Sequence, residues 1–310
     1  MKILFIDPVH PSLWKALSKK NFECVEGYAL SKDETQQIIV DFDGIVIRSR
    51  FKIDSAFLDA CKDLKFIARS GSGLENIDVS YAQAKGIHCI NASEGNAQAV
   101  AEHALAMILS LLNNLNKADA EVRKGIWQRS ENRGYELYGK TVGIIGYGNT
   151  GSAFAKLLNG FDCNVLSYDK YLESFTTNWA RKVEMNEIFE HADILSLHLP
   201  LTEESTYLVE QKYISRFKKP IYLINTSRGK CVHTKTVLSA LNDGRLSGAC
   251  LDVLEFEKTS FNETFFSEEF NELIKSDKVI LSPHIAGWTY ESYQKLSKVL
   301  LAKILAVTDN

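Results

Sequence analysis

Short apolar runs alternate with helical patterns along the whole chain. The runs are continuously apolar, which is typical of strands that are covered on both faces. Strands of that kind occur in parallel sheets, where a helix crosses over between successive strands. The pattern therefore predicts an α/β fold, and a length of 310 residues indicates two domains of about 150 residues each. The runs are KILFID, GIVIRS, LKFIARS, TVGIIGYG, CNVLSYD, DILSLHLP, IYLINTS, SGACLDV and KVILSPH.

A glycine-rich turn follows one of these runs. The stretch TVGIIGYGNTG places Gly146, Gly148 and Gly151 in the pattern G-x-G-x-x-G, between an apolar strand and the helical segment SAFAKLLNG. In such turns the first glycine permits a tight bend, the second lets a pyrophosphate approach, and the third lets helix and strand pack closely. The helix N-terminus then faces the phosphates. The stretch predicts a dinucleotide site, and the alternative is a glycine turn that binds no ligand.

The next apolar run, CNVLSYD, ends in an acidic residue. The interval from Gly151 to Asp169 is close to the usual one of about 20 residues in dinucleotide-binding folds. A carboxylate at this position accepts hydrogen bonds from the adenosine ribose hydroxyls and repels a 2′-phosphate. The sequence therefore favours NAD over NADP as the cofactor.

Three ionisable residues follow later strands, and ligands bind beyond the carboxyl ends of such strands. Arg228 follows IYLINTS, Glu257 follows SGACLDV, and His284 ends KVILSPH. Beside a nicotinamide, His284 would take the hydroxyl proton as hydride leaves a hydroxy acid, and return it in reverse. Glu257 would fix the imidazole tautomer and favour imidazolium. Arg228 would bind a carboxylate through two parallel hydrogen bonds.

Each of these three residues has a simpler interpretation when it is taken alone. His284 after a proline suits a buried structural histidine, Glu257 suits a solvated charge in the acidic stretch EFEKTSFNETFFSEEFNE, and Arg228 suits a surface ion pair. Only their conjunction with a dinucleotide motif favours catalysis.

Two features of the first third suit an anionic substrate. Arg48 and Arg50 are two residues apart, so on a strand they would point to the same side and could hold a phosphate or carboxylate. Gly71, Ser72 and Gly73 could form a nest of backbone N–H groups. Solvated charges at a strand end and a plain glycine turn are the respective alternatives.

Two segments have helical periodicity. Residues 96–124 predict one long, largely buried helix with Val100, Ala104, Met107, Ile108, Leu111, Leu112 and Leu115 on its apolar face. It suits a domain connection, a subunit interface or a core helix. The tail from residue 288 to 310 predicts a second helix that needs an apolar surface to cover.

Composition excludes several classes of protein. A formal charge of −3 gives no reason to expect nucleic acid as a partner. No apolar run approaches the roughly 18 residues of a membrane helix. The six cysteines form no CxxC pair, so we expect no metal site and reduced thiols. The opening MKILFID suits a strand better than a signal peptide. We therefore expect a cytoplasmic protein.

The motifs GYGNTG, LHLPLT, NTSRGK, LDVLEFE and SPHIAGWT resemble those of the D-isomer-specific 2-hydroxyacid dehydrogenases, and most of all those of the short form of D-3-phosphoglycerate dehydrogenase. The resemblance extends through IRSR, RSGSGLENID and NASEGNAQAVAEHAL, and so covers almost the whole chain. One departure is Lys258, where the family usually has a proline after the glutamate.

The resemblance implies a Rossmann-type, doubly wound NAD-binding domain, residues 97–284, inserted in a smaller flavodoxin-like substrate-binding domain, residues 1–96 plus 285–310. It places the catalytic triad on Arg228, Glu257 and His284 and the substrate contacts on Arg48, Arg50, Ser72 and Gly73. Family members are commonly homodimers, and a homotetramer stays open. The cofactor contacts that it implies, besides the three glycines and Asp169, are Asn149, Thr150, His198, Pro200, Thr226, Asp252, Ala286 and Gly287.

The expected activity is NAD-dependent oxidation of D-3-phosphoglycerate to 3-phosphohydroxypyruvate, a step of serine biosynthesis. The alternative is a hydroxypyruvate or glyoxylate reductase, or another D-2-hydroxyacid dehydrogenase. A third reading is a non-catalytic, NAD-sensing protein like the corepressors of this fold.

Overall fold

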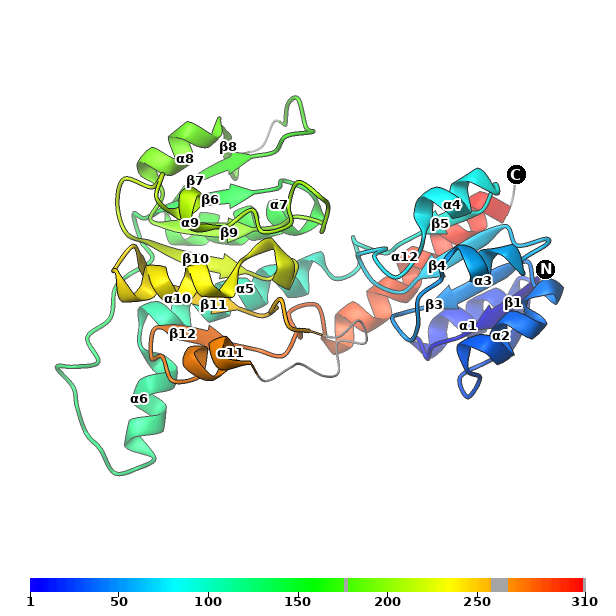
Figure 1. The fold of residues 1–310 in the computed structure, drawn as a ribbon, viewed down its shortest axis with the longest axis horizontal. Coiled ribbons are helices and arrows are strands. Elements are labelled where there is room, and N and C mark those ends of the chain that lie inside the picture. The colour runs from blue at the N-terminus through cyan, green and yellow to red at the C-terminus, as the bar shows by residue number, and fades with distance from the viewer. Residues whose placement is uncertain (176–177, 258–266, 309–310) are drawn as a thin grey trace. The chain divides into compact units, whose positions relative to one another are not determined.

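The computed structural model describes residues 1–175, 178–257 and 267–308. The chain forms two compact units. Unit 1 contains Met1–Ala97 and the C-terminal segment from Trp288, and unit 2 contains Gln98–Glu257 and the segment that ends at Gly287. Each unit is an α/β structure around one parallel sheet, which confirms the predicted fold class (Figure 1). Lys258 and the acidic stretch after it, residues 258–266, lie outside the described residues.

The five-stranded sheet of unit 1 has the order β2-β1-β3-β4-β5, and its paired strands are parallel. This is the flavodoxin-like order of a doubly wound sheet. The strands are β1 (Lys2–Phe5), β2 (Glu23–Glu26), β3 (Gly44–Ile47), β4 (Phe66–Arg69) and β5 (His88–Ile90). The helices are α1 (Pro11–Lys19), α2 (Lys32–Ile38), α3 (Ser55–Asp59), α4 (Val79–Ala84) and α12 (Tyr290–Thr308), with the 3-10 turn η1 (Ile39–Asp41).

The C-terminal helix α12 covers one face of this sheet. Its buried residues Leu296, Leu300 and Ile304 pack in one cluster with Phe5 of β1 and Phe66 of β4. The predicted tail helix therefore exists, and the apolar surface that it requires is supplied by the N-terminal strands of the same unit.

The seven-stranded sheet of unit 2 has the order β12-β11-β10-β9-β6-β7-β8. Numbered from β6, this is the 3-2-1-4-5-6 order of dinucleotide-binding folds with one added edge strand. The strands are β6 (Thr141–Ile145), β7 (Asn164–Tyr168), β8 (Arg181–Lys182), β9 (Ile194–Leu197), β10 (Ile221–Asn225), β11 (Leu246–Leu251) and β12 (Val279–Leu281). The helices are α5 (Ala97–Leu112), α6 (Leu115–Val122), α7 (Asn149–Leu158), α8 (Met185–His191), α9 (Gln211–Ile214), α10 (Thr234–Asn242) and α11 (Glu268–Leu273), with η2 (Asn159–Phe161) and η3 (Gly229–Cys231).

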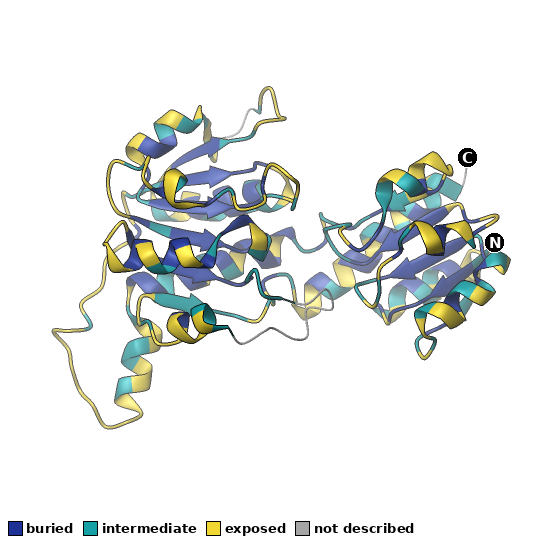
Figure 2. Cartoon of the chain, in the orientation of Figure 1, coloured by how far each residue is buried: buried dark blue, intermediate teal, exposed yellow. Residues whose placement is uncertain are grey.

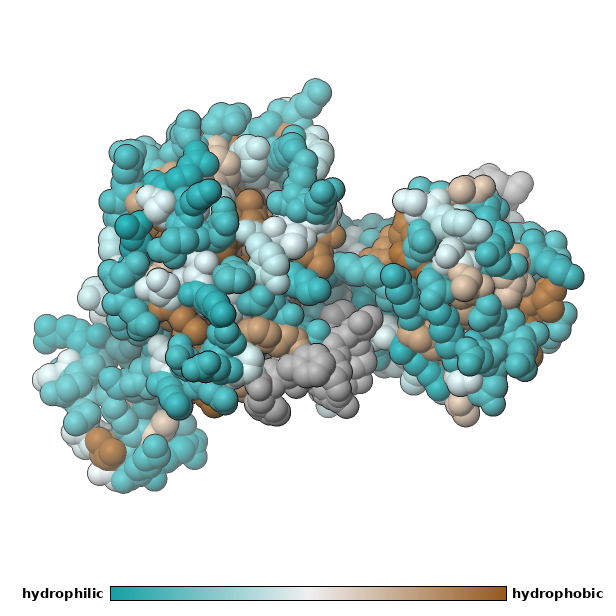
Figure 3. Space-filling model, in the orientation of Figure 1, coloured by the Kyte–Doolittle hydropathy of each residue, from teal (hydrophilic) through white to brown (hydrophobic). Residues whose placement is uncertain are grey.

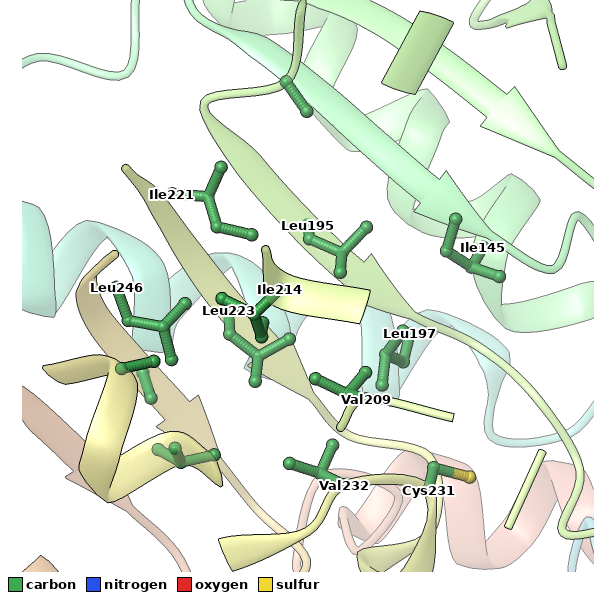
Figure 4. Close-up of a cluster of buried hydrophobic side chains, with 14 of the residues drawn as sticks. Ile145, Leu195, Leu197, Val209, Ile214, Ile221, Leu223, Cys231, Val232 and Leu246 are labelled. Carbon is green, nitrogen blue, oxygen red and sulfur yellow. The ribbon is translucent and has the colours of Figure 1, made fainter. Parts of the chain in front are cut away.

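Helices cover both faces of this sheet, which explains its continuous apolar runs. In β6, Ile144 packs in the cluster with α5 and α7, whereas Ile145 packs in the cluster with α8, α9 and α10. Neighbouring strands divide their side chains in the same way, so the central strands β6, β7, β9, β10 and β11 are mostly dark blue in Figure 2. Figure 4 shows the second cluster, with Leu195, Leu223 and Leu246 from three adjacent strands.

The long helix predicted over residues 96–124 is wrong in its second half. Helix α5 ends at Leu112, and Asn114 has a left-handed backbone with φ 52°, which breaks the helix before α6. Asparagine tolerates this conformation better than most residues. Leu115, predicted to be buried, is 61% exposed.

Among the described helices, none is long and apolar enough to cross a membrane.

Helix α6 and residues 123–140 form an arm that extends from the sheet of unit 2 (Figure 1). The arm is largely yellow and teal in Figure 2, and Figure 3 shows a brown patch near its tip. Trp127 is 83% exposed, and the arm's other exposed apolar or aromatic residues are Leu115, Val122, Ile126, Tyr135 and Tyr138.

Candidate active site

The glycine turn joins β6 to α7, and two of its glycines are required by close backbone contacts. Gly146 has φ +90°, and a Cβ there would lie 2.3 Å from the carbonyl oxygen of His198. A Cβ on Gly151 would lie 2.0 Å from the carbonyl oxygen of Gly146. At Gly148, in contrast, a Cβ would meet no described atom within 4 Å. The turn is therefore packed against backbone at Gly146 and Gly151. It is open at Gly148, the second glycine of the motif, where a pyrophosphate would approach.

Asp169 lies directly beside this turn, as the sequence predicts. Its Oδ2 accepts a hydrogen bond from the Tyr147 amide at 2.8 Å. Its Oδ1 accepts from the amides of Tyr171 and Leu172 at 2.9 and 3.1 Å. A carboxylate has about four acceptor positions, so these bonds orient Asp169 and leave capacity for ribose hydroxyls.

The residues of the turn and its neighbours fit a dinucleotide. Asn149 and Thr150 form the first turn of α7, whose N-terminal amides face the turn. Within the described chain, the hydroxyls of Thr226 and Tyr147 are buried and have no hydrogen-bond partner. They are two of six such side-chain atoms among the described residues, and a ligand bound at this edge of the sheet would give them partners. NAD would supply a hydride acceptor at this site.

His198 follows β9, and its side chain is buried and uncharged. Burial lowers the pKa of His198 to about 3, so the imidazole is neutral at physiological pH. Its Nε2 lies 2.9 Å from the hydroxyl of Ser196. Pro200, two residues on, is exposed, and its carbonyl accepts from Ser205 at 2.7 Å. The loop is thus held by its own hydrogen bonds.

Adjacent parallel strands bring the predicted triad to one edge of the sheet. Asn225 pairs with Leu251, and Leu251 pairs with Leu281, so β10, β11 and β12 end at the same level. Arg228, Glu257 and His284 belong to the loops that follow these strands.

His284 and Glu257 form a direct pair. Nδ1 of His284 lies 2.7 Å from Oε2 of Glu257, and both side chains are partly buried, with 23% and 17% exposure. The other oxygen of Glu257, Oε1, accepts from the Leu254 amide at 2.6 Å. A carboxylate held at both oxygens fixes the ring orientation and directs Nε2 away from the pair.

The backbone at His284 is strained and is fixed by Asp252. His284 has φ 55°, in the left-handed region that only a few per cent of non-glycine residues adopt. Its amide donates to the Asp252 carbonyl at 2.8 Å. The two carboxylate oxygens of Asp252 accept from the amides of Ile285 and Ala286, both at 2.9 Å. Asp252 is 1% exposed, so its carboxylate acts on the turn of residues 284–286 from inside the protein.

Arg228 lies on a loop that a buried asparagine organises. Asn225 donates its side-chain amide to the Arg228 carbonyl at 3.0 Å and accepts from Ser227 at 2.7 and 3.1 Å. A Cβ on Gly229 would lie 2.0 Å from the Leu254 backbone, so the Arg228 loop packs directly on the Glu257 loop. The Arg228 Nη1 donates to the Ser227 carbonyl at 2.7 Å. The sequence did not indicate this role of Asn225, because the residue belongs to the end of an apolar strand run.

In unit 1, Arg48 and Arg50 do not act as a matched pair on one strand. Strand β3 ends at Ile47, so both arginines lie beyond it. The Arg48 guanidinium stacks on the Trp288 ring, with 4.2 Å between Cζ and the ring centroid. The Arg50 guanidinium donates to three backbone carbonyls, those of Ile6, Gly27 and Tyr28. The two side chains therefore have different partners, because the strand geometry that would align them is absent.

The glycine loop after β4 differs in part from a simple nest. The Gly71 amide donates to the Arg69 carbonyl at 2.9 Å, so it is already used. Ser72 donates its hydroxyl to Asn96 at 2.6 Å, and its carbonyl accepts from Asn91 at 2.7 Å. Gly73 continues the same loop. Arg69 is only 8% exposed, and a Cβ on Gly71 would lie 2.5 Å from its Nη1. Arg69 was not singled out from the sequence, because it belongs to an apolar strand run.

The described residues contain no group of three or more His, Cys, Asp or Glu side chains that could hold a metal ion. All six cysteines are free thiols. Burial raises the pKa of Cys61, Cys89 and Cys163 to about 11.

Proteins of known family are similar to this chain in sequence. Residues 105–286 match the family model of the NAD binding domain of D-isomer specific 2-hydroxyacid dehydrogenases. The D-3-phosphoglycerate dehydrogenase of Archaeoglobus fulgidus is 31% identical over 307 residues, which are 98% of this chain and 57% of that protein. The chain thus spans little more than half of that relative's length. The hydroxypyruvate reductase of Thermotoga maritima is 33% identical over 298 residues, 96% of this chain and 95% of that protein.

The fold agrees over the full length as well. The crystal structure of D-lactate dehydrogenase from Aquifex aeolicus, complexed with NAD and lactic acid, matches with a TM-score of 0.81 and 27% identity. The match covers 100% of this chain and 96% of that chain. The chain therefore belongs to the D-isomer specific 2-hydroxyacid dehydrogenase family, and residues 105–286 match its NAD-binding domain.

Proposed function

We propose that this protein oxidises D-3-phosphoglycerate to 3-phosphohydroxypyruvate with NAD, as a step of serine biosynthesis in the cytoplasm. The observation that carries the dehydrogenase chemistry is the 2.7 Å pair of His284 and Glu257 at the strand ends that follow a dinucleotide turn. Unit 2 would bind NAD, with boundaries near residues 97–284, and unit 1 would bind the substrate, with residues 1–96 and 285–310.

The proposed chemistry uses three side chains of unit 2. Bound NAD would accept a hydride from the carbon that carries the hydroxyl. His284 would remove the hydroxyl proton through Nε2, since Nδ1 faces Glu257. Glu257 would stabilise the imidazolium that forms and keep the ring oriented. Arg228 would bind the substrate carboxylate and polarise the adjacent carbonyl.

The cofactor contacts are proposed on residues whose geometry is described above. Asp169 would bind the adenosine ribose and exclude a 2′-phosphate, and the open backbone at Gly148 would receive the pyrophosphate. The remaining contacts are proposed on Gly146, Asn149, Thr150, Gly151, His198, Pro200, Thr226, Asp252, Ala286 and Gly287.

The phosphate of the substrate would be recognised in unit 1. Arg48 is the better supported of the two arginines, because its guanidinium lies over the Trp288 ring, with 4.2 Å between Cζ and the ring centroid, and donates to none of the backbone carbonyls that hold Arg50. Arg50 would act with it only after leaving the backbone carbonyls to which it donates. Ser72 and Gly73 would bind the substrate carboxylate.

A comparison of kcat/KM for D-3-phosphoglycerate and D-glycerate tests this specificity. The proposal expects the phosphorylated acid to be preferred, and Arg48→Ala to reduce its kcat/KM while leaving that of D-glycerate nearly unchanged. Equal or better turnover of D-glycerate, or equal loss for both substrates, would reject it.

The second candidate function is a hydroxypyruvate or glyoxylate reductase. It is favoured by the relative from Thermotoga maritima, because this chain covers 95% of that hydroxypyruvate reductase. In that case reduction of hydroxypyruvate would exceed oxidation of D-3-phosphoglycerate in kcat/KM. A non-catalytic NAD sensor is the third candidate, and it would bind NAD without turnover of any D-2-hydroxy acid.

We also propose that the protein forms a homodimer, with a homotetramer as the alternative. The arm of α6 and residues 123–140 supports a self-association surface, because Trp127 is 83% exposed and other apolar side chains surround it in sequence. Sedimentation equilibrium of the intact chain and of Trp127→Ser would measure the oligomeric state directly.

A further inference from the structure

A chain of hydrogen bonds links helix α5 to the buried carboxylate of Asp252. The Ser282 hydroxyl, at the end of β12, donates to Oδ1 of Asp252 at 2.6 Å. Nε2 of His103, on α5, lies 2.9 Å from the same Ser282 oxygen and 3.6 Å from Oδ1 of Asp252. The three residues come from three separate elements of unit 2 and meet behind the turn of residues 284–286.

The direction of these bonds follows from the number of hydrogens. An ionised carboxylate only accepts hydrogen bonds, so the single hydroxyl hydrogen of Ser282 is directed to Asp252. The oxygen of Ser282 is then the acceptor for His103, whose Nε2 carries a hydrogen. Asp252 thus receives the Ser282 hydroxyl and the amides of Ile285 and Ala286 on its two oxygens.

We propose that His103 and Ser282 are positioning residues that hold His284 in its strained backbone conformation through Asp252. A histidine with φ 55° is stable only where its surroundings over-determine that conformation. The amides that follow His284 are fixed by the Asp252 carboxylate, and that carboxylate is fixed from behind by Ser282 and His103. The inference rests on the proposed role of His284 as the proton acceptor.

The expected consequence is a loss of orientation at His284. Without Ser282 or His103, the Asp252 carboxylate can rotate and the turn can relax from the left-handed conformation. The imidazole would then leave its productive position, whereas the hydrogen bonds that hold Asp169 beside the glycine turn share no residue with this chain. A misplacement of about 1 Å in a reacting group reduces a rate by up to about 100-fold.

Four variants test the proposal. Ser282→Ala and His103→Ala should each lower kcat about tenfold or more, with substrate KM changed less than about threefold. Ser282→Thr keeps the hydroxyl, and His103→Gln places an amide nitrogen near the position of Nε2. Both conservative variants should recover most of kcat. His191→Gln, an exposed histidine at the end of α8, is the matched control and should leave kcat unchanged.

Amide hydrogen exchange of Ile285 and Ala286, measured by NMR without substrate, gives a readout that does not depend on activity. The two alanine variants should exchange these amides faster than the wild type, while amides of β6 and α7 keep their rates. Unchanged kcat together with unchanged exchange in both alanine variants would overturn the proposal. If the wild type oxidises no hydroxy acid, the proposed function fails, and the exchange rates still decide whether His103 and Ser282 hold the turn.

Discussion

Glu257 uses its two oxygens for two different tasks: Oε2 lies 2.7 Å from Nδ1 of His284, and Oε1 accepts from the Leu254 amide at 2.6 Å. The carboxylate is thus fixed to its own loop and fixes the histidine in turn. The adjacent loop of Arg228 packs on the same backbone at Leu254 through Gly229. Three strand-end loops are joined in this way into one constellation.

Replacement of Glu257 should separate its charge from its hydrogen bond. Glu257→Gln keeps an acceptor oxygen for Nδ1 but removes the charge that stabilises imidazolium. We expect kcat of Glu257→Gln to be about 10- to 100-fold below that of the wild type, and kcat of Glu257→Ala to be lower still. These losses stay within the factor of about 10²- to 10⁴-fold that general acid–base catalysis contributes. Steady-state kinetics of the two Glu257 variants measure these losses. The control is Glu190→Gln, which replaces an exposed glutamate of α8. A kcat of Glu257→Gln within twofold of the wild type would contradict the assignment.

Asp169 should set the cofactor preference. Its carboxylate is held by three backbone amides beside the glycine turn, so a 2′-phosphate would meet a fixed negative charge. We expect Asp169→Ser to lower kcat/KM for NAD about tenfold or more, because the ribose loses a charged acceptor; a tenfold loss corresponds to about 1.4 kcal/mol. The same variant should raise kcat/KM for NADP, because the negative charge that repels the 2′-phosphate is removed. Steady-state kinetics with both cofactors give the ratio of kcat/KM for NAD to kcat/KM for NADP. If this ratio is the same in Asp169→Ser and the wild type, Asp169 does not set the cofactor preference.

Gly146 and Gly160 offer a matched comparison of glycines. Gly146→Ala combines φ +90° with a contact of 2.3 Å to the His198 carbonyl, whereas a Cβ at Gly160 meets no described atom within 4 Å. We expect Gly146→Ala to reduce the free energy of unfolding by about 2–3 kcal/mol and to weaken NAD binding. Gly160→Ala should change stability by less than about 0.5 kcal/mol. Denaturant unfolding of both variants checks the difference, and equal stabilities would disprove the packing argument.

The neutral state of His198 predicts a pH dependence of stability. Burial lowers its pKa from 6.5 to about 3 in the folded protein, so the unfolded chain binds the extra proton as pH falls below 6.5. Its contribution is fully present above pH 6.5 and is lost progressively as pH falls towards 3. Between about pH 7.5 and about pH 5.5, the wild type should lose about 1.4 kcal/mol more than His198→Gln in the free energy of unfolding. Parallel losses in the two proteins would show that His198 is not buried as a neutral ring.

Nine of the twelve described strands were predicted from the sequence. Eight are inner strands of the two sheets, where burial on both faces leaves a continuous apolar run, and the ninth is the edge strand β12. The three strands that were not predicted are β2, β5 and β8, and all three are edge strands of their sheets. Their sequences, ECVE, HCI and RK, are short and partly exposed. Unlike the edge strand β12, whose sequence is VIL, none of these three strands contains three consecutive apolar residues, so the hydrophobic pattern was too weak to recognise.

The candidate site was predictable where spacing along the chain determines it. Gly146, Gly151 and Asp169 meet because a strand, a turn, a helix and a strand of usual lengths bring them together. The partners of the site residues were not predictable in the same way. His103 meets Ser282 across a sequence separation of 179 residues, and Arg50 turns to backbone carbonyls because β3 ends at Ile47.

The most direct test of the account is the absorbance of NADH formed from NAD and a panel of D- and L-2-hydroxy acids, for the wild type and His284→Ala. We expect the wild type to oxidise D-acids, D-3-phosphoglycerate best among them, and His284→Ala to retain NAD binding but to lose at least about 100-fold in kcat. Turnover that persists in His284→Ala, or a wild type that binds NAD and oxidises none of the acids, would contradict the central claim.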